Sequence, residues 1–339
     1  MSLSLYQIRV LRYSIGVALA MAISQGFGWF MSFLVPVLLL SFLNPPAAEF
    51  KVRDAIKFLS AIAIACFAGY YISKLVNYPL VYVCILFLCF VLLFSASEKT
   101  IPKGLKTWLL IAILLIPTLT ITSKNISLLI ALMLFAGAIV TCAIALFMYF
   151  LLPNPAKTEK SLEAKAEAAK EPPPRERFYQ ALESSIVIFP VVIMFNIYQW
   201  NGAMITLIFI AILSSMPAFA KSWKVGKFLL LGNFLGGIVS MIYYQIMTYV
   251  PEYFYMILIA FILALIFAQQ IMSGKPSGQL FASAFSTVLV IVGSVFLSDG
   301  AASEKVWTRI FQIMMAVTYV VLAFSFIDRW KVYLNRSKA

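Results

Sequence analysis

Long apolar runs separated by short polar turns repeat along the whole chain. A helix needs about 20 apolar residues to cross a bilayer, and runs of about this length recur throughout. The pattern predicts an all-α polytopic membrane protein with twelve transmembrane helices, at 10–26, 29–43, 58–75, 79–95, 107–121, 127–152, 182–198, 202–218, 227–248, 253–271, 279–297 and 305–327.

One long polar stretch interrupts this pattern near the middle of the chain. It alternates glutamates and lysines among alanines and ends at Pro172-Pro173-Pro174, as expected of a short charged helix followed by a stiff spacer. We therefore expect three parts: a first six-helix repeat at 1–152, a cytoplasmic linker at 153–178 and a second six-helix repeat at 179–339.

The composition agrees with a membrane location and excludes a water-soluble fold. Of the 339 residues, 63% are hydrophobic and 12% are charged, whereas a soluble domain carries about 25% charged residues. With both termini in the cytoplasm, all lysines and arginines except Lys74, Lys124, Lys305 and Arg309 fall on the cytoplasmic side. Cytoplasmic loops collect such residues, so the net charge of +13 is topological and needs no nucleic acid.

The residues that usually carry chemistry are missing or dispersed. The chain has no histidine, and its four cysteines lie inside apolar runs without a CxxC pair. It has no phosphate-binding loop and no nucleophile elbow. We expect no catalytic residues, no metal site and no cofactor, so the protein is not predicted to be an enzyme.

The two halves correspond in order at a nearly constant separation. At 171 residues, Pro46 matches Pro217, and three small residues spaced by four match three others. This predicts duplication into two parallel repeats, related by an axis along the membrane normal, with a substrate path between them. The small residues predict a groove for close helix packing in each half: Ala61, Ala65, Gly69, Gly232, Gly236 and Ser240.

Uncharged polar residues inside the spans are candidates for the substrate path. They are Asn44, Asn196, Asn233, Gln245 and Gln312. Each has two interpretations, a hydrogen bond between helices or a position along the path, because polar groups inside a membrane are costly unless they have partners or a function.

One pair of opposite charges follows the same repeat. Arg12 and Glu183 are also separated by 171 residues, and each lies at the inner start of the first span of its half. We expect an ion pair between the repeats if these helices lie together; two independent interfacial charges are the alternative.

The pattern resembles the superfamily of fusaric-acid-resistance and aromatic-acid-exporter proteins. The likeness comprises an arginine-led first helix, a short first hairpin with a proline at its inner end, and a basic stretch before a helix with regular small residues (Arg9, Arg12, Tyr13, Pro46, Lys51, Val52, Arg53, Lys57). In the second half, residues 232–236 resemble the superfamily's G-T-x-x-G signature, with Asn233 in place of threonine. The chain would be a short member, because larger members carry sizeable cytosolic domains.

The resemblance implies an efflux component in a bacterial inner membrane that exports small amphipathic or aromatic organic acids. It also implies a periplasmic adaptor of the membrane-fusion type as a partner, and it leaves a homo-oligomer open. Three alternatives remain: a carrier of the major-facilitator type, a non-transporting membrane scaffold and a passive anion channel. Against the first, the region 44–53 lacks the usual loop containing glycine and aspartate.

Overall fold

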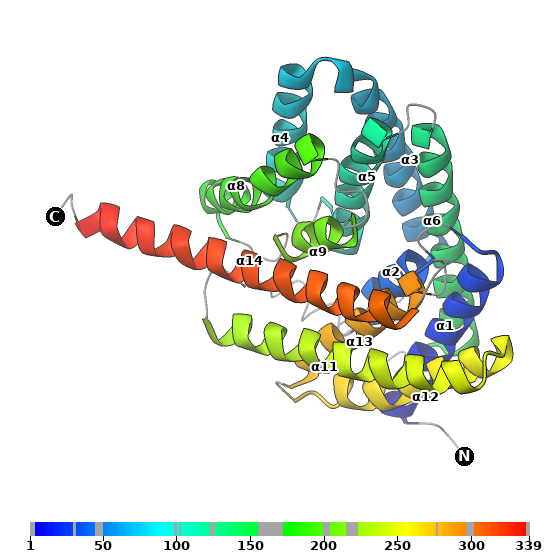
Figure 1. The fold of residues 1–339 in the computed structure, drawn as a ribbon. Coiled ribbons are helices and arrows are strands. Elements are labelled where there is room, and N and C mark those ends of the chain that lie inside the picture. The colour runs from blue at the N-terminus through cyan, green and yellow to red at the C-terminus, as the bar shows by residue number, and fades with distance from the viewer. Residues whose placement is uncertain are drawn as a thin grey trace. The chain divides into compact units, whose positions relative to one another are not determined.

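The computed structural model describes residues 4–29, 32–44, 50–97, 100–101, 103–122, 126–154, 172–198, 204–214, 223–275, 277–295 and 302–336 (Figure 1). Within these ranges the regular structure is helical, which confirms the all-α prediction there. The helices are α1 (Leu5–Gly26), α2 (Leu34–Leu43), α3 (Val52–Lys74), the 3₁₀ turn η1 (Leu75–Asn77), α4 (Pro79–Ser95), α5 (Lys103–Thr122), α6 (Ile126–Leu151), α8 (Pro174–Tyr198), α9 (Met204–Ser214), α11 (Trp223–Tyr249), α12 (Tyr253–Ile271), α13 (Gly278–Val295) and α14 (Ala302–Arg336).

Several of these helices are long and apolar enough to cross a membrane. Five such segments lie within the described ranges: Val52–Asn77, Ser127–Leu151, Pro174–Tyr198, Tyr253–Ile271 and Ile310–Trp330. The chain is therefore a helical, multi-pass membrane protein. The twelve helices of the described part correspond one to one with the predicted spans.

Some helices extend beyond the apolar runs that predicted them. α1 starts at Leu5 because Ser4 and Gln7 form a capping box, with the Gln7 N–H donating to Ser4 Oγ at 3.3 Å and the Ser4 N–H donating to Gln7 Oε1 at 2.9 Å. α8 starts at Pro174, a residue suited to the first helical turn, and α14 continues to Arg336. Hydropathy detects only the apolar part of a helix, so the polar ends were missed.

The second helix of the first half, α2, is shorter than predicted, and the described part of α9 is of similar length. α2 has 10 residues and α9 has 11, which correspond to about 15 Å and 17 Å of helix. α2 ends at Leu43 because Asn44 is extended (φ −70°, ψ 144°), the conformation favoured before a proline. The prolines matched in the repeat, Pro46 and Pro217, and linker residues 155–171 lie outside the described residues.

The chain divides into two compact units, and the division does not follow the two sequence halves. Unit 1 contains 1–60, 135–170 and 231–310; unit 2 contains 61–134, 171–230 and 311–339. Each unit thus draws segments from both halves, and the boundaries fall inside α3, α6, α11 and α14. The two compact units therefore differ from the predicted repeats at 1–152 and 179–339, which are copies in sequence joined by 153–178. The duplication itself stays a prediction.

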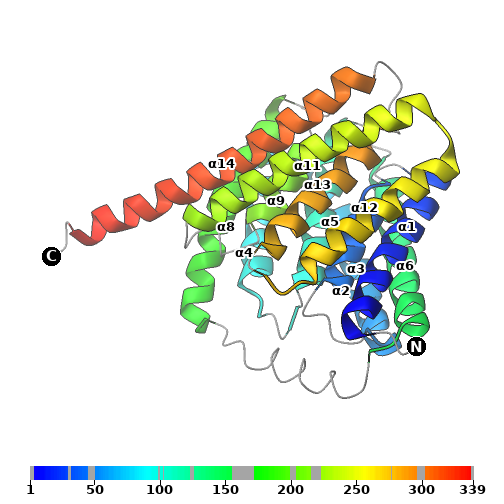
Figure 2. The ribbon, with the colours of Figure 1, turned by 90° about the horizontal axis from the view of Figure 1, so that it is seen from below.

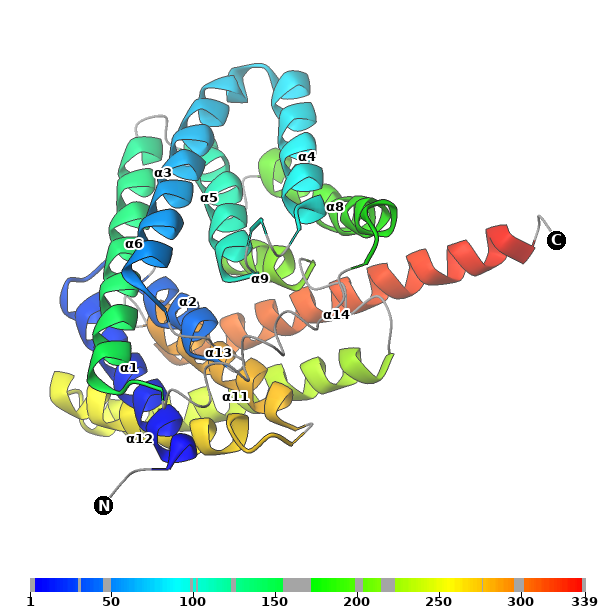
Figure 3. The same cartoon turned by 180° about the vertical axis from the view of Figure 1, so that it is seen from behind.

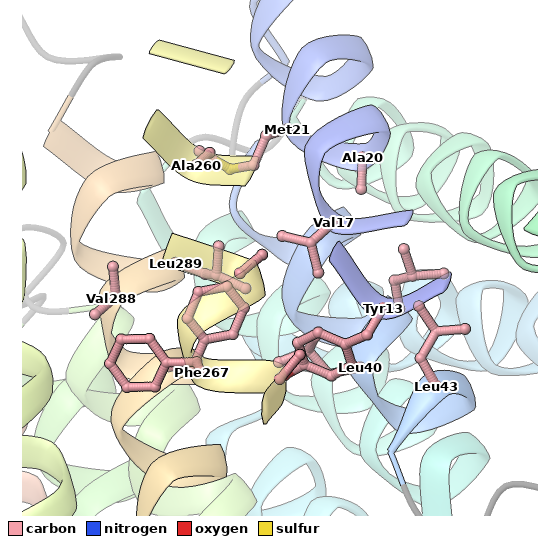
Figure 4. Packing of buried hydrophobic residues seen from close by; sticks show 14 of the residues in the cluster. Tyr13, Val17, Ala20, Met21, Leu40, Leu43, Ala260, Phe267, Val288 and Leu289 are labelled. Atoms are coloured by element: carbon pink, nitrogen blue, oxygen red, sulfur yellow. The ribbon is translucent and has the colours of Figure 1, made fainter. Parts of the chain in front are cut away.

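In unit 1, α1 packs on α12 and α2, α12 packs on α13, and α13 packs on α2 (Figures 2 and 3). Figure 4 shows the core between them, where Tyr13 and Val17 of α1 lie near Leu40 of α2, Phe267 of α12 and Leu289 of α13. The rings of Phe267 and Phe285 stack with centroids 5.1 Å apart, and the ring of Tyr13 lies 5.8 Å from that of Phe285. Dense packing of this kind holds membrane helices together, because lipid provides no hydrophobic drive between them.

In unit 2, α8 packs on α4 and α9, α4 packs on α5, and α5 packs on α9. The rings of Phe87 in α4 and Phe189 in α8 meet edge to face with centroids 4.9 Å apart. Tyr319 of α14 donates a hydrogen bond to the carbonyl of Val187 in α8 at 2.8 Å. The same ring of four contacts therefore occurs in both units, with α8, α9, α4 and α5 in the places of α1, α2, α12 and α13.

Candidate functional site

A polar cluster lies in unit 2 where α4, α5 and α8 meet. Pro79 starts α4 and places Tyr82 in its first turn, where its side chain is 3% exposed. Thr118 follows Pro117 in α5, and Asn196 lies in the last turn of α8. Asn196 and Thr118 lie near the Tyr82 hydroxyl, so three helices contribute polar side chains to one location.

The Tyr82 hydroxyl interacts with the side chains of Asn196 and Thr118, but several buried polar atoms of this cluster make no hydrogen bond of good geometry. They include Tyr82 Oη and both amide atoms of Asn196, whereas the Thr118 hydroxyl donates to the carbonyl of Leu114 at 2.6 Å. α9, which belongs to the same unit, adds two further unpartnered hydroxyls, Thr206 Oγ1 and Ser214 Oγ. A buried polar group without a partner is destabilising by about 1–3 kcal/mol, so the polar atoms gathered at Tyr82 and Asn196 favour a site that a polar ligand or water completes.

Unit 1 places a similar pair of residues where α1 ends and α12 begins. Gln25 lies in the last turn of α1 with its Nε2 buried and unpartnered, and Tyr253 opens α12. The Tyr253 hydroxyl donates to the carbonyl of Ala22. Gln25 and Asn196 differ by 171 residues, as do Tyr82 and Tyr253, so the repeat separation could have identified Tyr82 and Gln25, which sequence reasoning missed.

The predicted path residues have different environments. Asn233 is 2% exposed and joins α11 to α13, donating to Ser283 Oγ at 3.3 Å and accepting from Thr287 Oγ1 at 2.5 Å. Asn44 follows the end of α2, its N–H donates to the carbonyl of Leu40 at 2.8 Å, and its Oδ1 is buried without a partner. The first interpretation, a hydrogen bond between helices, thus describes the geometry of Asn233, whereas Asn44 and Asn196 retain unpartnered atoms.

The remaining two path candidates lie elsewhere. Gln245 is exposed on α11, and Gln312 is half-buried on α14. Asn44, Asn233 and Gln245 belong to unit 1, while Asn196 and Gln312 belong to unit 2. Of the five, Asn196 lies beside Tyr82 and Thr118, whereas Asn233 lies among Ser283 and Thr287 with its polar atoms hydrogen-bonded.

The small residues of the predicted grooves lie against neighbouring helices. A Cβ on Gly69 of α3 would stand 3.0 Å from the carbonyl oxygen of Ala112 in α5, and one on Gly232 of α11 would stand 2.9 Å from that of Leu280 in α13. On the same helices, Ala65 is 4% exposed and Ala61 half-buried, while Gly236 and Ser240 are buried. In each unit, the third helix of one half approaches the fifth helix of that half at these positions.

Arg12 is surrounded by partners from unit 1. Its guanidinium is 2% exposed, donates to the carbonyl of Leu152 at 3.2 Å and to Asn154 Oδ1 at 3.0 Å, and lies 4.0 Å from the centre of the Tyr149 ring. Glu183 is half-buried on α8 and belongs to unit 2. The predicted ion pair between Arg12 and Glu183 stays a prediction.

Comparison with known proteins adds one match. A family model described as a protein of unknown function (DUF2955) matches residues 9–148, which is less than half of the chain. The match runs from Arg9 in α1 to Met148 in α6, close to the limits predicted for the first repeat. No curated protein and no solved structure matches the chain. The resemblance to aromatic-acid exporters gains no support from these comparisons.

Proposed function

We propose that this protein is a transporter of the bacterial inner membrane that exports small amphipathic or aromatic organic acids. The observation that carries the proposal is the buried polar cluster of Asn196, Tyr82 and Thr118, in which the amide of Asn196 makes no hydrogen bond of good geometry. Buried polar groups are expensive in a membrane protein, and they are retained mainly along substrate or ion pathways. An uncharged cluster can bind the polar group of a passing solute without trapping it.

The proposed architecture has twelve spans, both termini in the cytoplasm and two copies of a six-helix ancestor. Its support is the matched packing: helices one and two of each half pack on helices four and five of the other half, in the same pairwise order. Duplication followed by exchange of equivalent helices produces such a pattern, because each copy then satisfies contacts that the ancestor made with itself. The 171-residue separation of the paired residues agrees with this origin.

This arrangement argues against a carrier of the major-facilitator type. In those carriers each six-span half is built from repeats nested within that half. Here each compact unit takes helices from both halves. The substrate class and the periplasmic membrane-fusion adaptor rest on the resemblance to aromatic-acid exporters, and the basic cytoplasmic side supports the orientation.

Uptake into inverted membrane vesicles tests the proposal. With an imposed pH gradient, vesicles containing the protein should accumulate radiolabelled benzoate, and Asn196→Leu should reduce the initial rate at least about fivefold. Gln270→Leu, which removes an exposed amide from α12 and is not a path candidate, is the matched control and should transport normally. Benzoate flux that ignores the gradient would identify a passive channel. No flux of any aromatic acid tested would favour the membrane scaffold.

A further inference from the structure

The start of α1 and the end of α6 meet at a concentration of positive charge in unit 1. Arg9 and Arg12 lie three residues apart on α1, so they share one face of the helix. Asn154 follows the end of α6 and accepts a hydrogen bond from Arg12 through its Oδ1. The ring of Tyr149 covers the guanidinium of Arg12 from the side of α6.

Two donors on these segments, one on the Arg12 face of α1 and one on the residue that binds Arg12, are buried and have no acceptor. They are Arg9 Nη2 and Asn154 Nδ2, and the side chain of Asn154 is only 7% exposed. Asn154 uses its acceptor atom on Arg12, so its remaining atom can only donate. These two donors can therefore bind an acceptor, and the neighbouring guanidinium groups favour a negatively charged one.

The acidic side chains that the structure describes in unit 1 lie in other environments. Asp54 is exposed at the start of α3 and accepts from the N–H of Lys51. Glu252 precedes α12, whose opposite end lies beside the start of α1, since Tyr6 donates to the carbonyl of Gln269. The 19 residues of α12 therefore separate Glu252 from this location by about 28 Å.

We propose that Arg9 and Asn154, beside the positive charge of Arg12, form a binding site for a single oxyanion. Guanidinium and amide N–H groups together recognise carboxylate or phosphate oxygens, and such charge-assisted bonds are the strong ones. The carboxylate of a soluble organic acid and the phosphate of an anionic lipid present the same oxygens. The site does not depend on transport, but its role in loading an exported acid from the cytoplasmic side rests on the proposed function.

Binding is tested on the full-length protein in neutral detergent, with benzoate as the soluble probe and benzamide as its uncharged counterpart. Benzoate should raise the unfolding temperature in a saturable manner, and benzamide should not. Arg9→Gln and Asn154→Leu should each weaken benzoate binding at least about tenfold, the loss expected for one charge-assisted hydrogen bond. Arg53→Gln removes an exposed arginine from the same unit and should bind like wild type. Arg9→Lys keeps the charge and replaces Arg9→Gln if that variant does not fold.

Three results separate the proposals. The bound oxyanion is a lipid phosphate if phosphatidylglycerol in mixed micelles stabilises the protein through Arg9 and Asn154 and benzoate does not. This result supports the binding site and excludes its role in loading an exported acid. The site is overturned if benzoate binding is unchanged in both Arg9→Gln and Asn154→Leu, or if neither benzoate nor phosphatidylglycerol stabilises the protein. It is also overturned if benzoate binds only to the Glu183→Gln variant. Binding without vesicle transport would leave the site standing while the proposed function fails.

Discussion

Gly236 of α11 lies against the backbone carbonyl of Ala284 in α13, so closely that a Cβ on Gly236 would overlap that oxygen. In the other unit, Gly69 of α3 lies against the carbonyl of Ala112 in α5. Small residues let two membrane helices approach until backbone atoms touch, which is a main source of their association. In each half, the contact joins the third helix to the fifth helix of the same half.

Gly236→Ala should therefore destabilise the protein although alanine is the better helix former. The added methyl group must push α11 and α13 apart, and overpacking of this kind lowers the free energy of unfolding by about 1–3 kcal/mol. Thermal unfolding in detergent measures the loss. Gly237→Ala is the control, because the atoms nearest to its Cβ would belong to the Ile310 side chain, at 3.3 Å and beyond, and not to a backbone carbonyl. Equal unfolding temperatures for the two variants would contradict the close contact.

Asn233→Leu should lower the stability of the protein, whereas Asn196→Leu should not. Leucine at 196 removes two unpartnered buried atoms, so the free energy of unfolding should stay the same or rise by up to about 1 kcal/mol. Leucine at 233 removes the bonds to Ser283 and Thr287 and should lower it by about 1 kcal/mol. Parallel unfolding curves decide the matter; a clear loss of stability for Asn196→Leu would show that its amide has a structural partner.

Arg12→Gln should lower the free energy of unfolding by about 3 kcal/mol. The substitution removes two charge-assisted hydrogen bonds and a ring contact while leaving the carbonyl of Leu152 and the Asn154 side chain unsatisfied. The matched control is Arg53→Gln, which should unfold at the wild-type temperature. If Arg12→Gln lowers the unfolding temperature no more than Arg53→Gln does, Arg12 does not link α1 to the end of α6.

Charge reversal tests the predicted pairing of Arg12 with Glu183. Arg12→Glu and Glu183→Arg should each reduce the yield of folded protein, and the double exchange should recover part of it if the two charges meet. Size-exclusion chromatography of membranes solubilised in parallel provides the measurement. Without any recovery, the two charges act independently.

Cross-linking tests the packing of one half on the other. In a background with the four native cysteines replaced, Phe87→Cys and Phe189→Cys together should react with a short bis-maleimide, because the two rings meet with centroids 4.9 Å apart. Cleavage within the linker before electrophoresis would leave the two halves joined. The single variant Phe87→Cys in the same background is the negative control. If the halves separate in the Phe87–Phe189 pair, α4 does not pack on α8.

Hydropathy predicted where the helices of this chain lie but less well where they end. Apolar runs such as 79–95 and 253–271 coincide with α4 and α12, since a helix that faces lipid and protein must be apolar along its whole length. The ends of α1, α8 and α14 were missed because capping residues and amphipathic turns continue a helix into the polar headgroup region.

The candidate site was only partly predictable for a related reason. A polar residue within an apolar run identifies Asn196 and Asn233 equally, and nothing in their local sequence says that Asn233 meets Ser283 and Thr287 while Asn196 makes no hydrogen bond of good geometry. Tyr82 was not predicted because tyrosine is common near membrane interfaces, so only its neighbours distinguish it.

The sequence by itself determined that this chain is a helical membrane protein, because solvent transfer free energies depend on each residue and add along a span. It also contained the paired residues at a separation of 171. Only the tertiary structure decided which helices meet, placing α1 on α12 and α4 on α8 across the two halves. Contacts between distant segments depend on shape and on the pairing of buried polar atoms, and neither is a property of a single segment.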